Sequence, residues 1–369
     1  MTEIQPARGP IGCAQSIEQP SLRCGTCLTD AAGRPGSASN TYSIFDVAPG
    51  APVFMLSGQG SQKPGMGFDL MDMPEVAETF SCASDVLGYD VADFVVHAEP
   101  AKLNDTRFAQ PALCVLSVAV ACALMARGVR PAAVLGFSLG QVSALAVSGM
   151  LTCEDTFKFV KVRSELMAEA AVANPGAMSA LLKADEAAVE GLCNECAEGD
   201  VLVPANFNCP GQIVIAGTPA AVERAEVAWA ASGKRSSRLA TSGAFHSPLM
   251  ASAAEGVAAY LEGVEFSEPR VPLICNVTAE PLTAADAREH LMRHLTSPVR
   301  FQQSVEALAA VGASTFVEVG FGGVLTNLVK RIDKTVARTC VQDRASFDAC
   351  LAVPSALVTD TPDSITNSE

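Results

Sequence analysis

Ser138 lies between two glycines in the sequence GFSLG, from Gly136 to Gly140, a spacing typical of serine nucleophiles. Residues 132–136 before it predict a buried strand, and the residues from Gln141 onward predict a helix. In this strand–turn–helix order, the glycines let strand and helix approach closely, and the hydroxyl group lies at the helix N-terminus. The backbone N–H of Leu139 would then point toward an oxyanion formed on an attacked carbonyl group. A glycine-bordered turn without chemistry is the alternative.

A serine nucleophile needs a base, and the chain has four histidines. His246 lies in a loop rich in Gly, Ser and Pro, where an inserted unit is expected to rejoin the main domain, so we expect it to face a cleft. His290 and His294 are four residues apart on a predicted helix, which suits two metal ligands, but no third ligand is evident. His246 is therefore a candidate base, with a solvated loop histidine as the ordinary alternative. The favoured interpretation of His290 and His294 is the C-terminal turn of an amphipathic helix, and we predict no metal site.

Composition limits the classes of partner and compartment. The 369 residues carry a formal net charge of −15, and 49% of them are apolar, which is ample for a buried core. The negative charge argues against broad nucleic-acid binding and against a polybasic membrane surface. No apolar run is expected to span a membrane, and the N-terminus lacks the basic-then-apolar order of a signal peptide. We expect a cytoplasmic protein.

The thirteen cysteines favour reduced thiols, because their number is odd and most lie in apolar runs. Two C-x-x-C pairs have spacings that suit zinc or redox chemistry: Cys24 with Cys27, and Cys193 with Cys196. Neither has an obvious second ligand pair. The sequence therefore favours ordinary thiols at both places.

The chain divides into segments of different character. Residues 1–49 are rich in Gly, Pro, Ser and Ala and predict a disordered leader, and 346–369 predict a C-terminal tail. Alternating strand and helix patterns in 50–175 and 242–345 predict a large subdomain with a mostly parallel sheet. Residues 176–241 follow a β-α-β-β-α-β order, which predicts an inserted ferredoxin-like small subdomain. The cleft between the two is the expected ligand site.

Local patterns place the main elements. Residues 52–56 predict a second buried strand, and 111–127 and 152–173 predict helices. Thr152, with Asp155 three residues later, makes a start resembling a capping box for the later helix. In the small subdomain the predicted strands are 177–182, 201–208, 212–217 and 235–241, and the predicted helices are 185–196 and 219–231.

Seven motifs resemble the malonyl-CoA:acyl carrier protein transacylase family, in that family's order and spacing, from about residue 51 to 335. They are SGQGSQKPGMG (57–67), FAQPAL (108–113), GFSLGQVSAL (136–145), VRSELM (162–167), ANFNCPGQIVIAG (205–217), GAFHSPLM (243–250) and VEVGFGGVLTNLVKR (317–331). The resemblance implies an α/β-hydrolase-like large subdomain with a ferredoxin-like small one, in agreement with the alternation of elements.

The resemblance also implies residue roles. Ser138 would be the acylated nucleophile, and His246 its general base and acid. Gln59 and Leu139 would supply the backbone N–H groups of the oxyanion hole. Arg163 would hold the free carboxylate of the malonyl group, a task that suits a planar guanidinium with two parallel donors.

Two further residues carry implied roles, and two depart from the family pattern. Asn206 corresponds to a polar residue of the substrate pocket. His294 lies near the position of a glutamine whose backbone carbonyl orients the catalytic histidine, and we group it with the substrate-binding residues. Phe137 and Gln141 replace the family's usual histidine and glutamate, which puts pocket shape and rate in question.

The implied activity is transfer of a malonyl group from malonyl-CoA to the phosphopantetheine thiol of acyl carrier protein, in fatty acid or polyketide biosynthesis. It requires no metal or redox cofactor. Phe245, in the loop GAFH, would leave little room for a branched acyl chain and favours malonyl. A serine esterase or thioesterase is the main alternative, and a non-catalytic module that binds carrier protein is the other.

An acidic carrier protein would need a basic patch on this acidic chain. Two clusters are candidates for such a patch. The first contains Lys234, Arg235 and Arg238, and the second contains Lys330, Arg331 and Lys334.

Overall fold

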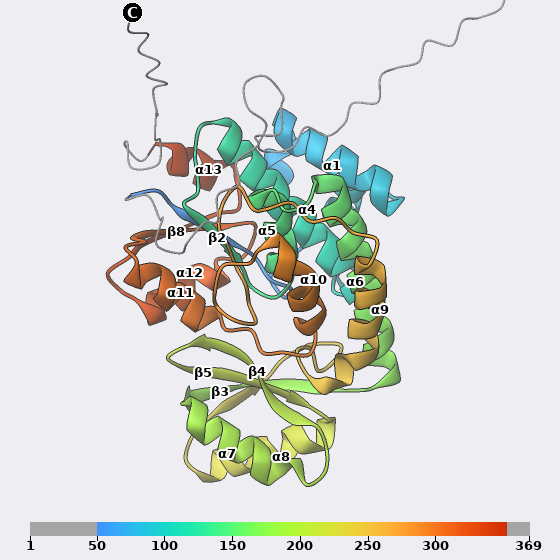
Figure 1. Ribbon diagram of the computed structural model, residues 1–369, viewed down its shortest axis with the longest axis vertical. Helices are drawn as coiled ribbons and strands as arrows, with labels where there is room; N and C mark the ends of the chain where they lie inside the picture. The colour runs from blue at the N-terminus through green and yellow to red at the C-terminus, as the bar shows by residue number, and fades with distance from the viewer. Residues whose placement is uncertain (1–49, 353–369) are drawn as a thin grey trace, which may run out of the picture.

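Two sheets divide the protein into two subdomains (Figure 1). The computed structural model describes residues 50–352, so the predicted leader and the end of the predicted tail lie outside the described residues. The larger sheet has the order β7-β2-β1-β8-β9, and all its neighbouring strands are parallel. Its strands are β1 (Val53–Leu56), β2 (Ala133–Gly136), β7 (Leu273–Ile274), β8 (Thr315–Val319) and β9 (Ala337–Val341).

Helices cover this sheet, as the alternation in the sequence predicts. They are α1 (Pro74–Leu87), α2 (Val91–His97), α3 (Pro100–Leu103), α4 (Thr106–Ala126), α5 (Leu139–Ser148), α6 (Cys153–Ala173), α9 (Ala251–Leu261), α10 (Ala284–Arg293), α11 (Phe301–Ala310), α12 (Val324–Ile332) and α13 (Arg344–Leu351), with short 3-10 turns at Phe68–Leu70 and Pro248–Met250. The predicted cap of α6 is confirmed, because the Thr152 side chain accepts a hydrogen bond from the Asp155 backbone N–H.

The predicted boundary between large subdomain and tail is wrong at the C-terminal end. Helix α13 continues the fold to Leu351, beyond residue 345. Phe347 and Cys350 on this helix are buried, and the backbone N–H of Arg344 donates to an Asp69 carboxylate oxygen at 2.8 Å. Burial of apolar side chains therefore holds α13 against the large subdomain.

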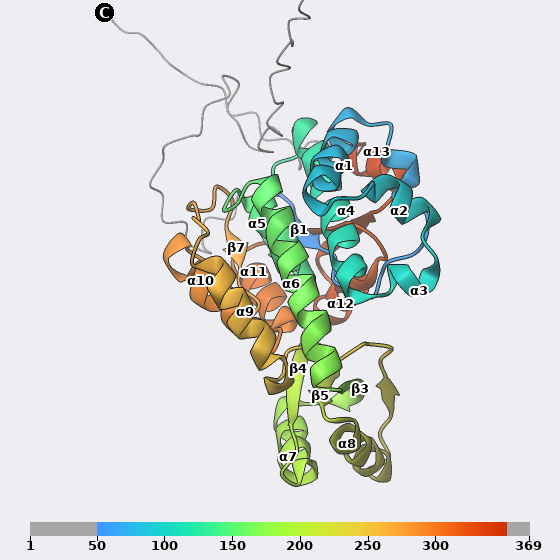
Figure 2. The same ribbon diagram turned by 90° about the vertical axis from the view of Figure 1, so that its right-hand side faces the viewer.

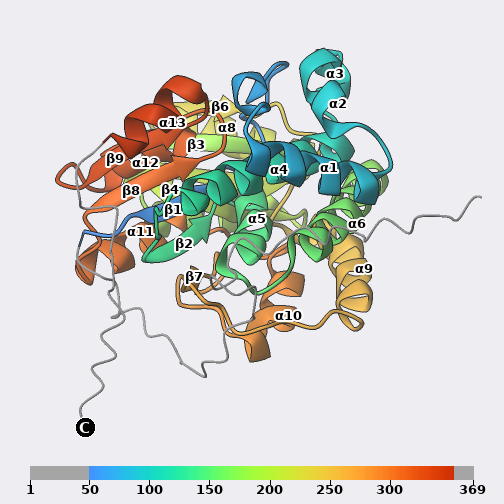
Figure 3. The ribbon, with the colours of Figure 1, turned by 90° about the horizontal axis from the view of Figure 1, so that it is seen from above.

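Helix α4 is the central helix of the large subdomain, beside α5 (Figure 3). It begins at Thr106, earlier than predicted, because Asp105 caps its N-terminus and Pro111 is accommodated inside it. Contrary to the sequence expectation, α4 is long and apolar enough to cross a membrane, with a mean hydropathy of 2.0, but 94% of that window is buried in the protein. A helix that is apolar on all sides and covered by protein is a core helix of a soluble domain.

The small subdomain has the predicted β-α-β-β-α-β order. Its elements are β3 (Ala177–Ala184), α7 (Glu186–Ala197), β4 (Leu202–Cys209), β5 (Gly211–Gly217), α8 (Pro219–Ala231) and β6 (Ser236–Arg238). The strands pair antiparallel in the order β4-β5-β3-β6, the ferredoxin-like arrangement. Helices α7 and α8 cover one face of this sheet, and the other face lies toward the large subdomain (Figures 1 and 2).

Most cysteines in the described residues behave as predicted. Nine carry free thiols: Cys82, Cys114, Cys153, Cys193, Cys196, Cys209, Cys275, Cys340 and Cys350. Cys122 departs from the expectation of reduced thiols, because it is disulfide-bonded. Within residues 50–352, no group of three His, Cys, Asp or Glu side chains could hold a metal ion. Cys24 and Cys27 lie outside the described residues.

The turn between β2 and α5 depends on two glycines. A Cβ atom on Gly136 would lie 1.8 Å from the carbonyl carbon of Gly140, and a Cβ atom on Gly140 would lie 2.0 Å from the carbonyl oxygen of Leu56. Both distances are far below van der Waals contact, so only glycine allows this approach of strand and helix. The end of β1 and the start of α5 are thereby held together at Ser138.

We expect Gly140→Ala to lower the free energy of unfolding by about 1 to 3 kcal/mol, because the added methyl group must displace the backbone of β1. Gly191→Ala is the matched control, since a Cβ atom there meets nothing within 4 Å on helix α7. That control is expected to stabilise by about 0.5 to 1 kcal/mol. Chemical denaturation of both variants measures the difference, and equal effects would contradict the packing argument.

Candidate active site

Ser138 has a strained backbone at the N-terminus of α5. Its φ of 51° and ψ of −104° lie in a region that side-chain-bearing residues rarely adopt. The residue is half-buried, and its backbone N–H donates to the Asn276 side-chain oxygen at 2.9 Å. Strain held by surrounding contacts is common at functional sites, and here it presents the hydroxyl group at a helix N-terminus as the sequence predicts.

The structure joins the predicted nucleophile to the predicted base. Ser138 Oγ lies 2.7 Å from His246 Nε2, across 108 positions of sequence. On the other side of the ring, His246 Nδ1 lies 2.9 Å from the carbonyl oxygen of His294. Because a carbonyl oxygen only accepts, Nδ1 carries the ring proton and Nε2 is free to accept the serine proton. This is the tautomer that a general base requires.

Burial keeps His246 neutral. The side chain is 3% exposed, and its pKa is lowered from 6.5 to about 4, first by desolvation and then by the positive charge of Arg163. At neutral pH the imidazole is therefore unprotonated and available as a base. Because the Arg163 charge acts on this pKa, the guanidinium lies within electrostatic range of His246.

Arg163 is a buried cation with unused hydrogen-bond donors. It lies on α6, is 1% exposed, and its Nη1 donates to the Gln110 side-chain oxygen at 2.5 Å. Its Nε and Nη2 have no partner among the described residues. These two nitrogens form one edge of the guanidinium, the edge that accepts a carboxylate through two parallel hydrogen bonds. Burial lowers the Arg163 pKa to about 10, so the group stays charged at neutral pH.

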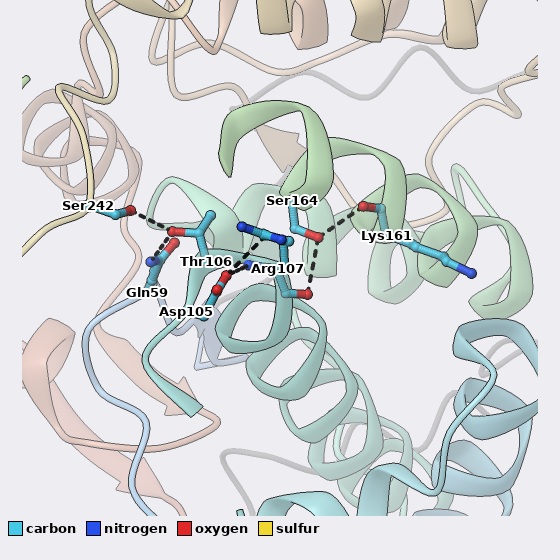
Figure 4. A network of polar contacts seen from close by, with 7 residues as sticks. All are labelled: Gln59, Asp105, Thr106, Arg107, Lys161, Ser164 and Ser242. Atoms are coloured by element: carbon cyan, nitrogen blue, oxygen red, sulfur yellow. Dashed lines mark hydrogen bonds and ion pairs between the residues drawn. The ribbon is translucent and has the colours of Figure 1, made fainter. Parts of the chain in front are cut away.

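A chain of side-chain hydrogen bonds leads from Arg163 to the loop that carries His246. Gln110 Nε2 donates to Gln59 Oε1 at 3.2 Å, and Gln59 Nε2 donates to Thr106 Oγ1 at 3.1 Å. Thr106 Oγ1 lies 2.9 Å from Ser242 Oγ (Figure 4). In both Gln59 and Gln110, the side-chain oxygen accepts a hydrogen bond and the amide nitrogen donates one, so the orientation of each carboxamide is fixed. The sequence analysis missed Gln110 and Thr106.

The predicted oxyanion-hole residues lie beside the nucleophile. A Cβ atom on Gly58 would lie 2.7 Å from the carbonyl oxygen of Phe137, so the loop of Gln59 touches the residue before Ser138. Leu139 is the first residue of α5, so its backbone N–H has no intrahelical acceptor. The Gln59 loop and the first turn of α5 therefore both lie next to the turn that carries Ser138.

Asn276 is a further residue of the site that the sequence analysis missed. It is fully buried two residues after β7, and its side chain contacts both Gly136 and Ser138. Its backbone N–H donates to Gln141 Oε1 at 2.5 Å. A polar residue at the carboxyl end of a parallel strand is the signal that could have found it, because ligand sites gather at that edge.

His294 contacts other residues of the site through both its backbone and its side chain. Its carbonyl oxygen orients His246, as the family resemblance implies, and its Nε2 lies 3.2 Å from Asn276 Oδ1. The alternative metal pair with His290 has no support within the described chain, where no candidate metal cluster occurs. Burial first, and then the neighbouring His246 and Arg163, lower the His294 pKa well below its usual value.

The two departures from the family pattern, Phe137 and Gln141, have structural roles. The Phe137 ring packs edge-to-face on Phe301, with ring centroids 5.5 Å apart. The fully buried Gln141 accepts a hydrogen bond from Asn276, a role for which a neutral amide suffices. Asn206 lies on β4 and forms a bridge with Val299 at the junction of the subdomains, and no described hydrogen bond joins its side chain to the serine or the histidine.

Comparison with known proteins identifies the family. The model of the acyl transferase domain matches residues 53–348. The malonyl CoA-acyl carrier protein transacylase of Escherichia coli K12 is 41% identical over 303 residues, covering 81% of this chain and 98% of that protein. The chain belongs to this transacylase family.

Solved structures of this transacylase family have the same fold. The malonyl-CoA:acyl carrier protein transacylase of Xanthomonas oryzae pv. oryzae aligns with a TM-score of 0.79 and 38% identity, covering 82% of this chain and 98% of that one. A malonyl-transacylase solved in complex with its type II PKS acyl-carrier protein also aligns with a TM-score of 0.79, at 40% identity, covering 82% of this chain and 99% of that one. The predicted fold class is therefore confirmed.

The two neutral, buried histidines predict a pH-dependent stability. Because the folded-state pKa values of His246 and His294 are lowered, the unfolded chain binds more protons below pH 6.5 than the folded chain does. The free energy of unfolding should therefore fall as pH drops from about 6.5 toward 4, by at most about 1.4 kcal/mol per pH unit for each histidine. Denaturation at pH values from 7.5 to 4.5 measures how the free energy of unfolding depends on pH. In the His246→Gln variant, this dependence should correspond to one proton fewer taken up on unfolding. An unchanged slope would contradict the assignment.

Proposed function

We propose that the chain transfers a malonyl group from malonyl-CoA to the phosphopantetheine thiol of acyl carrier protein, through an ester on Ser138. The observation that carries the proposal is the 2.7 Å contact between Ser138 and His246, within electrostatic range of a buried Arg163 whose Nε and Nη2 have no partner among the described residues. A nucleophile with its base and a receptor for a carboxylate thus occur together. The related transacylases are named for this substrate pair, and one of them was solved in complex with its acyl-carrier protein, which supports the proposal.

In the first step, His246 Nε2 takes the Ser138 proton as Oγ attacks the thioester carbonyl of malonyl-CoA. The backbone N–H groups of Leu139 and Gln59 stabilise the tetrahedral oxyanion. When the carbon–sulfur bond breaks, His246 returns the proton to the CoA sulfur, and a malonyl ester remains on Ser138. Arg163 holds the free carboxylate throughout, which fixes the acyl group for attack.

In the second step, the carrier thiol gives its proton to His246 and attacks the ester carbonyl. The tetrahedral intermediate collapses, the carbon–oxygen bond to Ser138 breaks, and the proton returns to Oγ. The two steps give ping-pong kinetics. The His246 imidazole carries every proton in both steps, so the reaction needs no metal or redox cofactor. We place the reaction in the cytoplasm, where the nine free thiols within residues 50–352 would stay reduced; the disulfide at Cys122 does not follow from this placement.

A serine esterase or thioesterase is less well supported. Such an enzyme commonly orients its histidine with a carboxylate, whereas His246 Nδ1 meets the backbone carbonyl of His294. It would also have no use for a buried guanidinium with a free edge. A non-catalytic binding module would not need the strained Ser138 backbone or its short contact to a neutral imidazole.

We expect Ser138→Ala to abolish the covalent malonyl adduct while leaving the fold intact, because the change removes a hydroxyl group and little volume. His246→Ala should slow acylation by roughly 10²- to 10⁴-fold, the usual contribution of a general acid–base group. Intact-protein mass spectrometry after mixing with malonyl-CoA measures both. Retention of the adduct by the Ser138→Ala variant would remove this residue from the mechanism.

Substrate choice should depend on Arg163. Replacing it with alanine leaves a malonyl carboxylate buried and unpaired, at a cost of about 2 to 5 kcal/mol, or roughly a 30-fold to several-thousand-fold loss in malonyl kcat/KM. Acetyl-CoA has no carboxylate, so acetyl transfer should hold steady or improve. Assays with both thioesters measure the preference, and a parallel loss for both would contradict the role of Arg163 as a carboxylate receptor.

The basic side chains of the two clusters have different partners in the fold. In the first, Arg238 binds Glu226 through two hydrogen bonds of 2.9 and 2.6 Å, and Lys234 lies 4.0 Å from the Trp229 ring centroid. In the second, Arg331 on α12 donates to the Pro210 carbonyl oxygen of the small subdomain at 3.2 Å. We propose that an acidic carrier protein docks at α12, where the cluster borders both subdomains.

Lys330→Glu with Lys334→Glu should raise the KM for carrier protein by about 3- to 10-fold at low salt, because charge complementarity acts mainly on encounter. Acylation by malonyl-CoA should change little. Arg235→Glu, on the other cluster, is the matched control. A larger effect of the control, or equal effects on both half-reactions, would contradict docking at α12.

A further inference from the structure

The Asn276 side chain lies where the β2–β7 ladder ends. The two strands pair at Val134 with Leu273 and at Leu135 with Ile274, and the chain of β2 then turns sharply into the serine. Beyond that point the carboxamide of Asn276 supplies the hydrogen bonds. Its Nδ2 donates to the Gly136 carbonyl oxygen at 2.7 Å, and its Oδ1 accepts from the Ser138 backbone N–H at 2.9 Å.

We propose that Asn276 is a positioning residue for the nucleophile, and that the His294 side chain fixes the orientation of the Asn276 carboxamide. The proposal rests on the proposed function only in taking Ser138 as the nucleophile. It assigns to Asn276 the task of holding the strained turn, and to His294 a side-chain role in addition to its backbone contact with His246.

The carboxamide can bridge the turn in one orientation only. The Gly136 carbonyl oxygen accepts a hydrogen bond from the amide, and the Ser138 N–H donates one to it. If the amide flipped, its oxygen would face the Gly136 oxygen and its NH₂ group would face the Ser138 N–H, and both hydrogen bonds would be lost. The backbone of Asn276 is held as well: its N–H donates to Gln141, and its carbonyl oxygen accepts from the Arg300 N–H at 2.9 Å. Asn276 is fully buried, so water does not replace these contacts.

The orientation of the amide determines the His294 tautomer. Asn276 Oδ1 only accepts, so His294 Nε2, 3.2 Å away, carries the ring proton. His294 Nδ1 is then unprotonated, and it has no hydrogen-bond partner among the described residues. The imidazole is fully buried, so its one polar task is this hydrogen bond to Asn276. One residue thus supports the base through its backbone and the nucleophile through its side chain.

This arrangement predicts an effect on the chemical step. Neither Asn276 nor His294 offers its side chain to the Arg163 edge, so binding of the acyl group should not depend on the amide. The position of Ser138 Oγ relative to its base does depend on it, and small displacements of a reacting group can cost about 10²-fold in rate. The expected signature is a lower rate constant with an unchanged KM.

The experiment measures acylation by malonyl-CoA in rapid-quench single turnovers, across a range of malonyl-CoA concentrations. Asn276→Ala should lower the limiting rate constant about 10²-fold and leave the half-saturating concentration within about threefold. Asn208→Ala is the matched control, because Asn208 is a buried asparagine on β4 without contact to the turn. The control should keep the wild-type rate constant even if its Tm falls.

A second pair of variants stays informative if Asn276→Ala does not fold. His294→Gln and His294→Leu both keep the backbone carbonyl that orients His246, but only glutamine offers an N–H donor to Asn276. The leucine variant should acylate about tenfold more slowly, in line with a lost buried hydrogen bond, and the glutamine variant should stay within about twofold of wild type. Equal rates in the two variants would overturn the role of the His294 side chain.

A fluorophosphonate separates this proposal from the proposed function. Ser138 Oγ attacks phosphorus, the phosphorus–fluorine bond breaks, fluoride leaves and the serine proton passes to His246, with no malonyl group involved. Labelling of Ser138 should be slower in Asn276→Ala and His294→Leu, even if wild type fails to react with malonyl-CoA. Labelling at wild-type rates in both variants would overturn the proposal and leave the proposed function standing.

Discussion

The hydrogen bond between Ser138 and His246 is the interaction on which the rest of the site depends. It brings together a turn after β2 and a loop that returns from the small subdomain, and it requires an unfavourable backbone at the serine. The glycines at 136 and 140 make the turn sterically possible. Hydrogen bonds from the Ser138 backbone N–H to Asn276 and from His246 to the His294 carbonyl oxygen then hold the two partners in place.

Burial gives the site its electrostatic character. His246 is neutral because protonation without water is costly, and Arg163 reinforces this by repelling a second positive charge. The guanidinium itself is buried with one edge unpaired, an arrangement that is costly until a carboxylate arrives. In the proposed reaction, this unpaired edge favours an acyl group with a free carboxylate. The neutral base and the unpaired cation follow from the same lack of solvent.

The sequence predicts much of this arrangement, but unevenly. The G-x-S-x-G spacing and the loop position of His246 make these two residues candidates without any relative, because glycines and loops have recognisable local patterns, and the family resemblance assigns their roles. Arg163 acquires its role only through the family resemblance, since an arginine on a helix has no distinguishing pattern. Gln110 and Asn276 were missed, because their importance comes from hydrogen-bond partners far away in sequence. The start of α4 was misplaced because Asp105 caps an earlier N-terminus and Pro111 is accommodated inside the helix, and the end of the fold was misplaced because burial of apolar side chains holds α13.

In the proposed reaction, Ser138 passes an acyl group from one thiol to another. Mass spectrometry can follow the acyl group on isolated malonyl-enzyme, with and without carrier protein bearing phosphopantetheine. We expect rapid appearance of malonyl carrier protein when the carrier is present and slow hydrolysis in its absence. Loss of the malonyl group to water at the same rate, whether or not carrier protein is present, would contradict it.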